Sequence, residues 1–220
     1  MRQELDREIN HITEQTIRMI SLVREMVEKS AHALSKQDPQ LAQEVIGLDQ
    51  QVDALELEVE AEVISMLARQ APVASDLRFA FTVIKALTDL ERSGDYAAHV
   101  AEDVVLLSKE PPLKNYVTLP DMGRRLTLML DLISKAFAER DLEAAKEVFR
   151  RDDEIDALYE EVSRELLTYM MEDPRTITKA LTLSRVARSY ERLGDHLENV
   201  SERILYWLTG KMEKKPEDVY

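Results

Sequence analysis

Two acidic motifs each occur twice in this sequence. The segment Glu91-Arg92-Ser93-Gly94-Asp95 returns as Glu191-Arg192-Leu193-Gly194-Asp195, with a Glu, an Arg, a Gly and an Asp at identical spacing. Upstream, Asp49-Gln50-Gln51-Val52-Asp53 is matched by Asp152-Asp153-Glu154-Ile155-Asp156. Carboxylates four residues apart share one face of a helix and repel each other. We therefore expect a compensating cation at each place, and a metal ion is the first candidate.

The motifs are also placed symmetrically about two predicted turns. In an antiparallel helical hairpin, residues equidistant from the turn lie at the same height. The motifs at 49–53 and 91–95 are equidistant from Pro72. The motifs at 152–156 and 191–195 are equidistant from the bond between Asp173 and Pro174. Each half of the chain should therefore bring four carboxylates together across two helices. The eight candidate metal ligands are Asp49, Asp53, Glu91 and Asp95 in the first half and Asp152, Asp156, Glu191 and Asp195 in the second.

The available ligand atoms limit which metal could bind. The chain has no Cys, so any metal must be held by oxygen or imidazole. Oxygen ligands suit hard cations such as Fe(III), Mn, Mg or Ca better than structural Zn. His99 could add a nitrogen beside Asp95, although its counterpart in the second half is Asn199. Glu28 and Asp131, equivalent across the repeat, could contribute from the first helix of each half.

A charge network without metal is the competing interpretation. Acidic pairs at this spacing occur elsewhere in the chain, and one such pair usually marks a solvated face. Arg92 and Arg192 could serve as salt-bridge partners of the motifs. Gly94 and Gly194 each cost about 1 kcal/mol in a helix interior. Either close helix approach or room for an ion cluster would explain these glycines.

The elements that position the motifs read as six long helices. Asp38 and Pro39 predict a helix cap followed by a first-turn proline. Ser75 is expected to cap the third helix, and a capping box is expected to begin at Thr118. Asp141 and the Asp173-Pro174 pair mark the remaining turns. The predicted fold is all-α, with two repeated antiparallel three-helix bundles at residues 1–112 and 113–210 and a polar C-terminal tail at 211–220.

Internal similarity supports the two halves. Residues 44–56 agree with 147–159 at six of thirteen positions, and 91–103 agree with 191–203 at six of thirteen, which indicates duplication. Apolar residues at three- and four-residue spacing predict packed stripes that lead to the acidic motifs. In the third and sixth helices, we expect these stripes to include Leu77, Ile177 and Leu181.

Composition narrows the functional class. A net charge of −14 argues against a nucleic-acid binder and suits cation binding or docking on a basic partner. No uncharged run approaches the length of a membrane span, and the N-terminus has no apolar signal core. The lack of Cys fits a cytoplasmic protein. We therefore expect a cytoplasmic protein without membrane insertion.

An enzymatic function has little support in the sequence. A ferritin-like di-iron oxidase needs two Glu-x-x-His motifs projecting into one core, and here only Glu8-Ile9-Asn10-His11 has that spacing. The sequence has no nucleophile–base constellation, phosphate-binding glycine loop or nucleotide motif. We expect no enzyme, and a helical adaptor without metal stays an alternative to a metal-binding protein.

The duplicated three-helix layout and the paired acidic motifs resemble the PhoU family. The resemblance includes the turn Ala71-Pro72-Val73-Ala74-Ser75-Asp76-Leu77-Arg78 and the segment Glu191-Arg192-Leu193-Gly194-Asp195-His196, and it extends from the first helix to Trp207. It implies a cytoplasmic protein, usually a homodimer, built from two three-helix bundles. It also implies a regulator of phosphate uptake that represses phosphate-starvation genes when phosphate is plentiful.

The resemblance further implies partners and a metal. The implied partners are the ATPase of the phosphate ABC transporter and a membrane sensor histidine kinase. In some members the acidic motifs hold multinuclear metal clusters, which makes iron the expected metal, with Mn, Mg or Ca as alternatives. The eight carboxylates named above are the matching positions. Asp at both positions of the second and fifth helices is the weakest match, because Asp preserves the carboxylate but shortens its reach.

Overall fold

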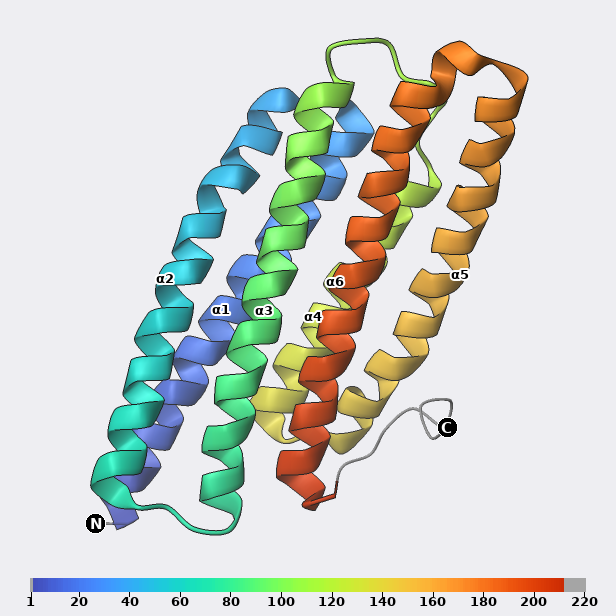
Figure 1. Ribbon diagram of the computed structural model, residues 1–220. Coiled ribbons are helices and arrows are strands. Elements are labelled where there is room, and N and C mark those ends of the chain that lie inside the picture. Colours follow the sequence, from blue (N-terminus) through green and yellow to red (C-terminus); the bar gives the residue numbers. More distant parts are fainter. Residues whose placement is uncertain (1, 212–220) are drawn as a thin grey trace.

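The computed structural model describes residues 2–211, and the regular structure in this range is helical (Figure 1). Six long helices confirm the predicted all-α class with two sets of three. They are α1 (Arg2–Lys36), α2 (Pro39–Gln70), α3 (Ser75–Leu107), α4 (Thr118–Glu139), α5 (Leu142–Glu172) and α6 (Ile177–Thr209), with a short 3₁₀ helix, η1 (Pro174–Thr176), before α6.

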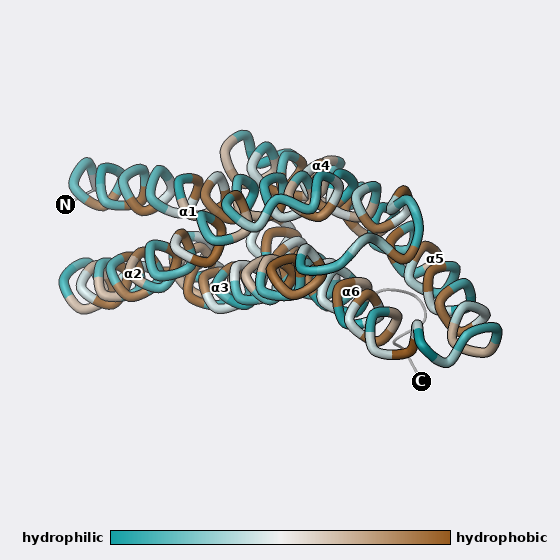
Figure 2. The backbone as a smooth tube through the Cα atoms, turned by 90° about the horizontal axis from the view of Figure 1, so that it is seen from above, coloured by the Kyte–Doolittle hydropathy of each residue, from teal (hydrophilic) through white to brown (hydrophobic). Residues whose placement is uncertain are grey.

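The helices form two layers (Figure 2). One layer is a row in the order α2, α3, α6, α5, and the other contains α1 and α4. The central helices α3 and α6 run antiparallel and pack side by side, so each half of the chain contacts the other along its last helix. The proposed boundary at 112/113 lies in the connection between α3 and α4. Of the predicted tail, only Lys211 lies within the described residues.

Two of the predicted helix starts are confirmed. The Asp38 carboxylate accepts hydrogen bonds from the backbone N–H groups of Gln40 and Leu41 at 3.0 and 3.1 Å, and Pro39 is the first residue of α2. Asp141 caps α5 in the same way. These side chains satisfy N–H groups that have no partner inside the helix. They fix where α2 and α5, the carriers of four candidate ligands, begin.

Two other predicted caps are wrong. Ser75 is the first residue of α3, and Ala74 before it has a positive φ of 51° and makes no side-chain cap. Thr118 is likewise the first residue of α4 and not its cap. The expected acidic member of that capping box, Asp121, instead accepts a hydrogen bond from Arg125 Nε at 2.8 Å. The arginine takes the carboxylate that the capping box required.

The core is continuous across both halves. Phe79, Phe137 and Trp207 form an aromatic cluster with ring centroids 5.2–6.1 Å apart, which joins α3, α4 and α6. Each fully buried side chain of this size contributes about 1.5–3 kcal/mol. The aromatic cluster itself contains no residue of the acidic motifs. None of the described helices has a stretch apolar enough to cross a membrane.

The predicted apolar stripes are wrong at their ends. Leu77, Ile177 and Leu181 are 48%, 40% and 51% exposed. All three lie in the first turns of α3 and α6, beside the hairpin turns, where neighbouring helices end. Further along, the stripes pack as expected, and Val52 and Ile155 beside the acidic motifs are fully buried.

Candidate metal centre

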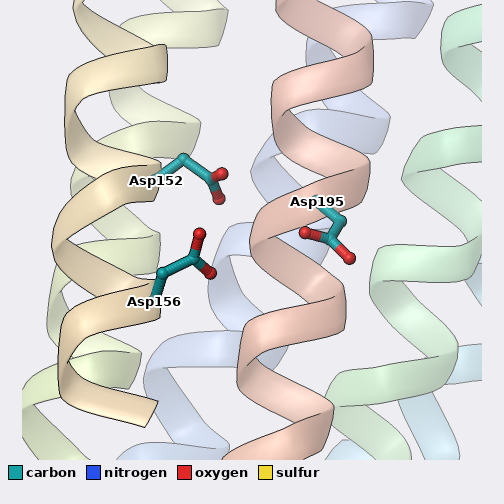
Figure 3. Close-up of side chains that lie close together, drawn as sticks. All are labelled: Asp152, Asp156 and Asp195. Atoms are coloured by element: carbon teal, nitrogen blue, oxygen red, sulfur yellow. The ribbon is translucent and has the colours of Figure 1, made fainter. Parts of the chain in front are cut away.

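Three of the predicted ligands in the second half lie together. Asp152 and Asp156 from α5 and Asp195 from α6 point toward one another, and each offers one carboxylate oxygen within 4.8 Å of the others (Figure 3). Asp152 is buried, Asp195 is half-buried and Asp156 is exposed. The cluster therefore extends from the core to the solvent. A cation there would have one buried ligand and would be accessible from the solvent.

The fourth predicted ligand of this half, Glu191, lies one turn before Asp195 on α6 and is not part of that close group. Burial raises the pKa of Glu191, and the charges of Asp195 and Asp156 raise it further. Arg192 opposes this shift. The charge of the cluster therefore acts on Glu191, although its oxygens are not among those that lie within 4.8 Å of one another.

In the first half, Asp49 from α2 faces Asp95 from α3. Burial, followed by the charges of Asp95 and Asp53, raises the pKa of Asp49 to about 6. Its Oδ1 is buried and has no hydrogen-bond partner among the described residues. Buried polar atoms are normally hydrogen-bonded, so an acceptor oxygen of this kind suits a cation. Burial and the charge of Asp95 also raise the pKa of Glu91 to about 6.

The two halves differ in how closely their carboxylates approach. Within residues 2–211, the first-half carboxylates Asp49, Asp53, Glu91 and Asp95 contain no group of three as tight as the second-half group. The structure therefore brings together three of the second-half positions and couples the first-half positions through their charges.

An arginine bridges one Glu and one Asp in each half. Arg92 Nη1 donates to Asp95 Oδ2 at 3.1 Å, and its Nε lies 3.6 Å from Glu91. Arg192 repeats this arrangement, with distances of 3.1 Å to Asp195 and 3.5 Å to Glu191. The predicted salt-bridge role of both arginines is thus seen. Each of these half-exposed guanidinium groups adds one positive charge beside the carboxylates, and exposed ion pairs contribute no more than about 1 kcal/mol.

Gly94 and Gly194 each lie beside an aspartate of the neighbouring helix. A Cβ atom at Gly194 would lie 2.7 Å from Asp152 Oδ1, which is too close for a real contact. A Cβ at Gly94 would have its tightest contact with Val52 Cγ1, at 3.3 Å, and would lie at an ordinary 3.5 Å from Asp49 Oδ1. Gly194 therefore leaves space for the Asp152 carboxylate, whereas Gly94 chiefly leaves space for the side chain of Val52.

The remaining candidates have other neighbours. The charge of His99 lowers the pKa of Asp49, so this ring lies on the side of the first cluster. Glu28 and Asp131 both pair with Arg24, at 2.9 and 2.6 Å, and link α1 to α4.

One contact between the halves was missed from the sequence. His196 Nδ1 lies 2.9 Å from Asp89 Oδ1, and the amide of Asn199 donates to the same oxygen at 3.4 Å. These side chains connect α6 to α3. The repeat gave no signal for this contact, because the position equivalent to Asp89 is Ser189.

Comparison with known proteins agrees with this architecture. The family model described as the PhoU domain matches residues 16–104 and 119–204. A phosphate-specific transport system accessory protein PhoU homolog from Deinococcus radiodurans is 46% identical over 97% of this chain and 100% of its own length. A protein of the same description from Aquifex aeolicus is 43% identical over 96% of each chain.

Solved structures show the same likeness. The crystal structure of PhoU from Pseudomonas aeruginosa superposes with a TM-score of 0.90 at 36% identity, covering 94% of this chain and 99% of that one. PhoU from Streptococcus pneumoniae gives a TM-score of 0.88 at 27% identity, covering 96% of this chain and 100% of that one. The duplicated domain, the full-length identity and the shared six-helix architecture together show that this chain belongs to the PhoU family.

Proposed function

We propose that this chain regulates phosphate uptake as an accessory protein of a phosphate-specific transport system. The observation that carries the proposal is full-length similarity, through both repeats, to proteins described as accessory to that system. Accessory proteins act through partners, and the family is regulatory rather than enzymatic. We propose the transporter ATPase and a membrane sensor histidine kinase as the partners, and repression of phosphate-starvation genes as the outcome.

Metal binding is the second part of the proposal. In the second half, Asp152, Asp156 and Asp195 would hold the ion, and Glu191 would be the fourth ligand. In the first half, the corresponding ligands would be Asp49, Asp53, Glu91 and Asp95. A bound cation would neutralise the mutual repulsion that raises the pKa of Asp49, Glu91 and Glu191. Iron in a multinuclear cluster is the proposed metal, with Mn, Mg or Ca as alternatives. We further propose a cytoplasmic homodimer that does not bind nucleic acid.

Gene deletion tests the regulatory part. In the native host, deletion should derepress a phosphate-starvation reporter in phosphate-rich medium, and the wild-type gene should restore repression. A host without a second copy of this family is required. Normal response of the reporter to phosphate in the deletion strain contradicts the assignment.

Complementation with carboxylate variants tests whether metal matters to regulation. D49N/D152N removes the innermost aspartate of each site, while E58Q/E161Q removes two charges from the same helices, α2 and α5. Both control residues are exposed, and neither forms an ion pair among the described residues. We expect the control to repress the reporter normally and D49N/D152N to repress it weakly. If both variants repress the reporter equally, regulation does not depend on these two aspartates.

A helical adaptor without metal is the second candidate. The arginine bridges favour it, because Arg92 and Arg192 already contact two carboxylates each. Elemental analysis of untagged protein purified without chelator decides between the two, since the adaptor contains no stoichiometric metal before or after reconstitution. A ferritin-like enzyme receives no support from its one matching motif. Its Glu8 pairs with Arg69 at 3.2 Å, and its His11 is exposed and contacts Glu62.

A further inference from the structure

A second group of charged side chains lies in the groove between α3 and α6. This groove contains a cavity of about 480 Å³. Arg185, Arg188, Ser189 and Arg192 line it from α6, and side chains within residues 96–106 line it from α3. We call this space the arginine pocket. It brings three guanidinium groups together in a chain whose net charge is −14.

The three arginines are not equally engaged. Arg185 donates to Asp103, with its Nε 3.3 Å from Oδ2, and Arg192 donates to Asp195 at 3.1 Å. Among the residues that the structure describes, Arg188 forms no ion pair, and it acts on Glu191 only through longer-range attraction. One exposed guanidinium therefore faces the pocket with its donors available, beside Arg185, which Asp103 holds, and Arg192, which Asp195 and Glu191 hold.

The repeat supplies an internal comparison for this pocket. The equivalent groove on the other half has Thr88 in place of Arg188 and Asp89 in place of Ser189. There, the Asp89 carboxylate is bonded to His196 at 2.9 Å, so that a polar contact spans α3 and α6. In the arginine pocket, Ser189 takes the place of that acid, and the acids that line the space are Glu102 and Asp103 on α3. The two grooves therefore differ in where their charges lie: the pocket has Arg188 where the other groove has Thr88, and Asp103 where the other groove has Arg203.

We propose that the arginine pocket binds a phosphoryl group, carried either by inorganic phosphate or by a nucleotide. Planar guanidinium groups form paired, charge-assisted hydrogen bonds with phosphate oxygens. A cavity of 480 Å³ lies within the size range of small-molecule sites. Arg188 makes the first contact, and Ser189 offers a hydroxyl donor. Tyr96 and Leu106 on α3 offer an apolar wall that a nucleoside would use and a free phosphate would not.

Neighbouring acids set the expected strength of binding. A phosphoryl group must compete with Asp103 for Arg185 and with Asp195 and Glu191 for Arg192. Glu102 also lines the pocket. The affinity should therefore be modest and should fall as salt rises, because the arginines are partly exposed.

Calorimetric titration of metal-free protein with inorganic phosphate and, separately, with ATP tests the proposal. Metal-free protein is used because a carboxylate-bound cation could itself recruit phosphate. The variant R188T/S189D gives the pocket the residues of its counterpart, and K85Q removes one positive charge from the equivalent groove. We expect one site per chain, about a tenfold or greater loss of affinity in R188T/S189D, and a change of less than about twofold in K85Q.

The outcomes distinguish the two sources of the phosphoryl group. Equal affinity for phosphate and ATP shows that the pocket recognises the phosphoryl group alone. Tripolyphosphate serves as a third probe that lacks the nucleoside. If ATP binds more tightly than tripolyphosphate and Y96A removes this difference, the pocket also recognises the nucleoside. If neither inorganic phosphate nor ATP binds at about 10 mM, the proposal is wrong. An equal loss of affinity in K85Q and R188T/S189D also overturns it, because this would indicate diffuse electrostatic attraction. Circular dichroism of each variant confirms that the helices are intact.

Discussion

Gly194 on α6 and Asp152 on α5 occupy complementary space: a methyl group at Gly194 would lie 2.7 Å from Asp152 Oδ1. Asp152 is 1% exposed, so its carboxylate has little room to move aside. At the equivalent pair in the first half, Gly94 and Asp49, the corresponding distance is 3.5 Å, an ordinary contact. The same substitution should therefore have different effects in the two halves.

We predict that G194A weakens metal binding at the second centre by about tenfold or more, because the new methyl group displaces the inner ligand. G94A should change affinity at the first centre by less than about threefold, because its Cβ would lie at an ordinary 3.5 Å from Asp49. Its 3.3 Å contact with the fully buried Val52 should offset most of the gain of about 1 kcal/mol from helix propensity, so the stability of the metal-free protein should change little. Titration with Mn²⁺ and thermal melts of the two variants measure both effects. Equal loss of affinity in G94A and G194A would contradict this account of the glycines.

We predict that the two centres bind metal independently. E191Q/D195N should remove about half of the bound metal, and E91Q/D95N should remove the other half, because each pair lies on a different helix hairpin. The combined variant should retain none. Elemental analysis after reconstitution gives the stoichiometry, with E58Q/E161Q as the control for charge loss. Metal content unchanged in the combined variant would exclude these carboxylates as ligands.

We predict that the stability of the metal-free protein falls as pH rises. The pKa values of Asp49 and Glu91 are raised from 3.8 and 4.5 to about 6 in the folded protein. A carboxyl group with a raised pKa binds its proton more tightly when folded, so its contribution is complete below the unfolded pKa and is lost as pH rises through the folded value. The loss should therefore extend from about pH 4 to about pH 7.

Thermal melts across this range measure the trend, and D49N/E91Q should flatten it because amides do not titrate. Saturating metal should reverse the slope, since the cation binds the deprotonated carboxylates. A melting temperature of the metal-free protein that rises steadily through this window, with an unchanged slope in D49N/E91Q, would contradict the assigned pKa shifts.

We predict that chelation lowers the melting temperature without unfolding the chain. The aromatic cluster of Phe79, Phe137 and Trp207 packs without any ion, and a ligand bound only to the native state stabilises it by mass action. Far-ultraviolet circular dichroism at room temperature should stay unchanged after chelation. Loss of helicity under those conditions would show that the metal is structural.

The fold could be predicted from the sequence because helical periodicity and cap residues such as Asp38 act locally. The candidate site could be predicted in outline because hairpin symmetry places Asp152 opposite Asp195 without knowledge of the rest of the fold. The collision that a methyl at Gly194 would cause could not be predicted, since it depends on the distance between two helix axes. The contact of His196 with Asp89 was missed for a related reason, because it joins helices that are far apart in the chain and has no copy in the repeat.

The bond between His196 and Asp89 also bears on how a duplicated chain can change. In a symmetric pair of identical single repeats, both grooves between the central helices would be encoded by the same codons. A substitution that opened one groove to a ligand would then remove the polar contact from both. Once two repeats are fused, one groove can keep its polar contact while the sequence of the other groove changes. Arg188 and Ser189 stand where the other repeat has Thr88 and Asp89, so the duplicated chain keeps the polar contact in one groove and carries different side chains in the other.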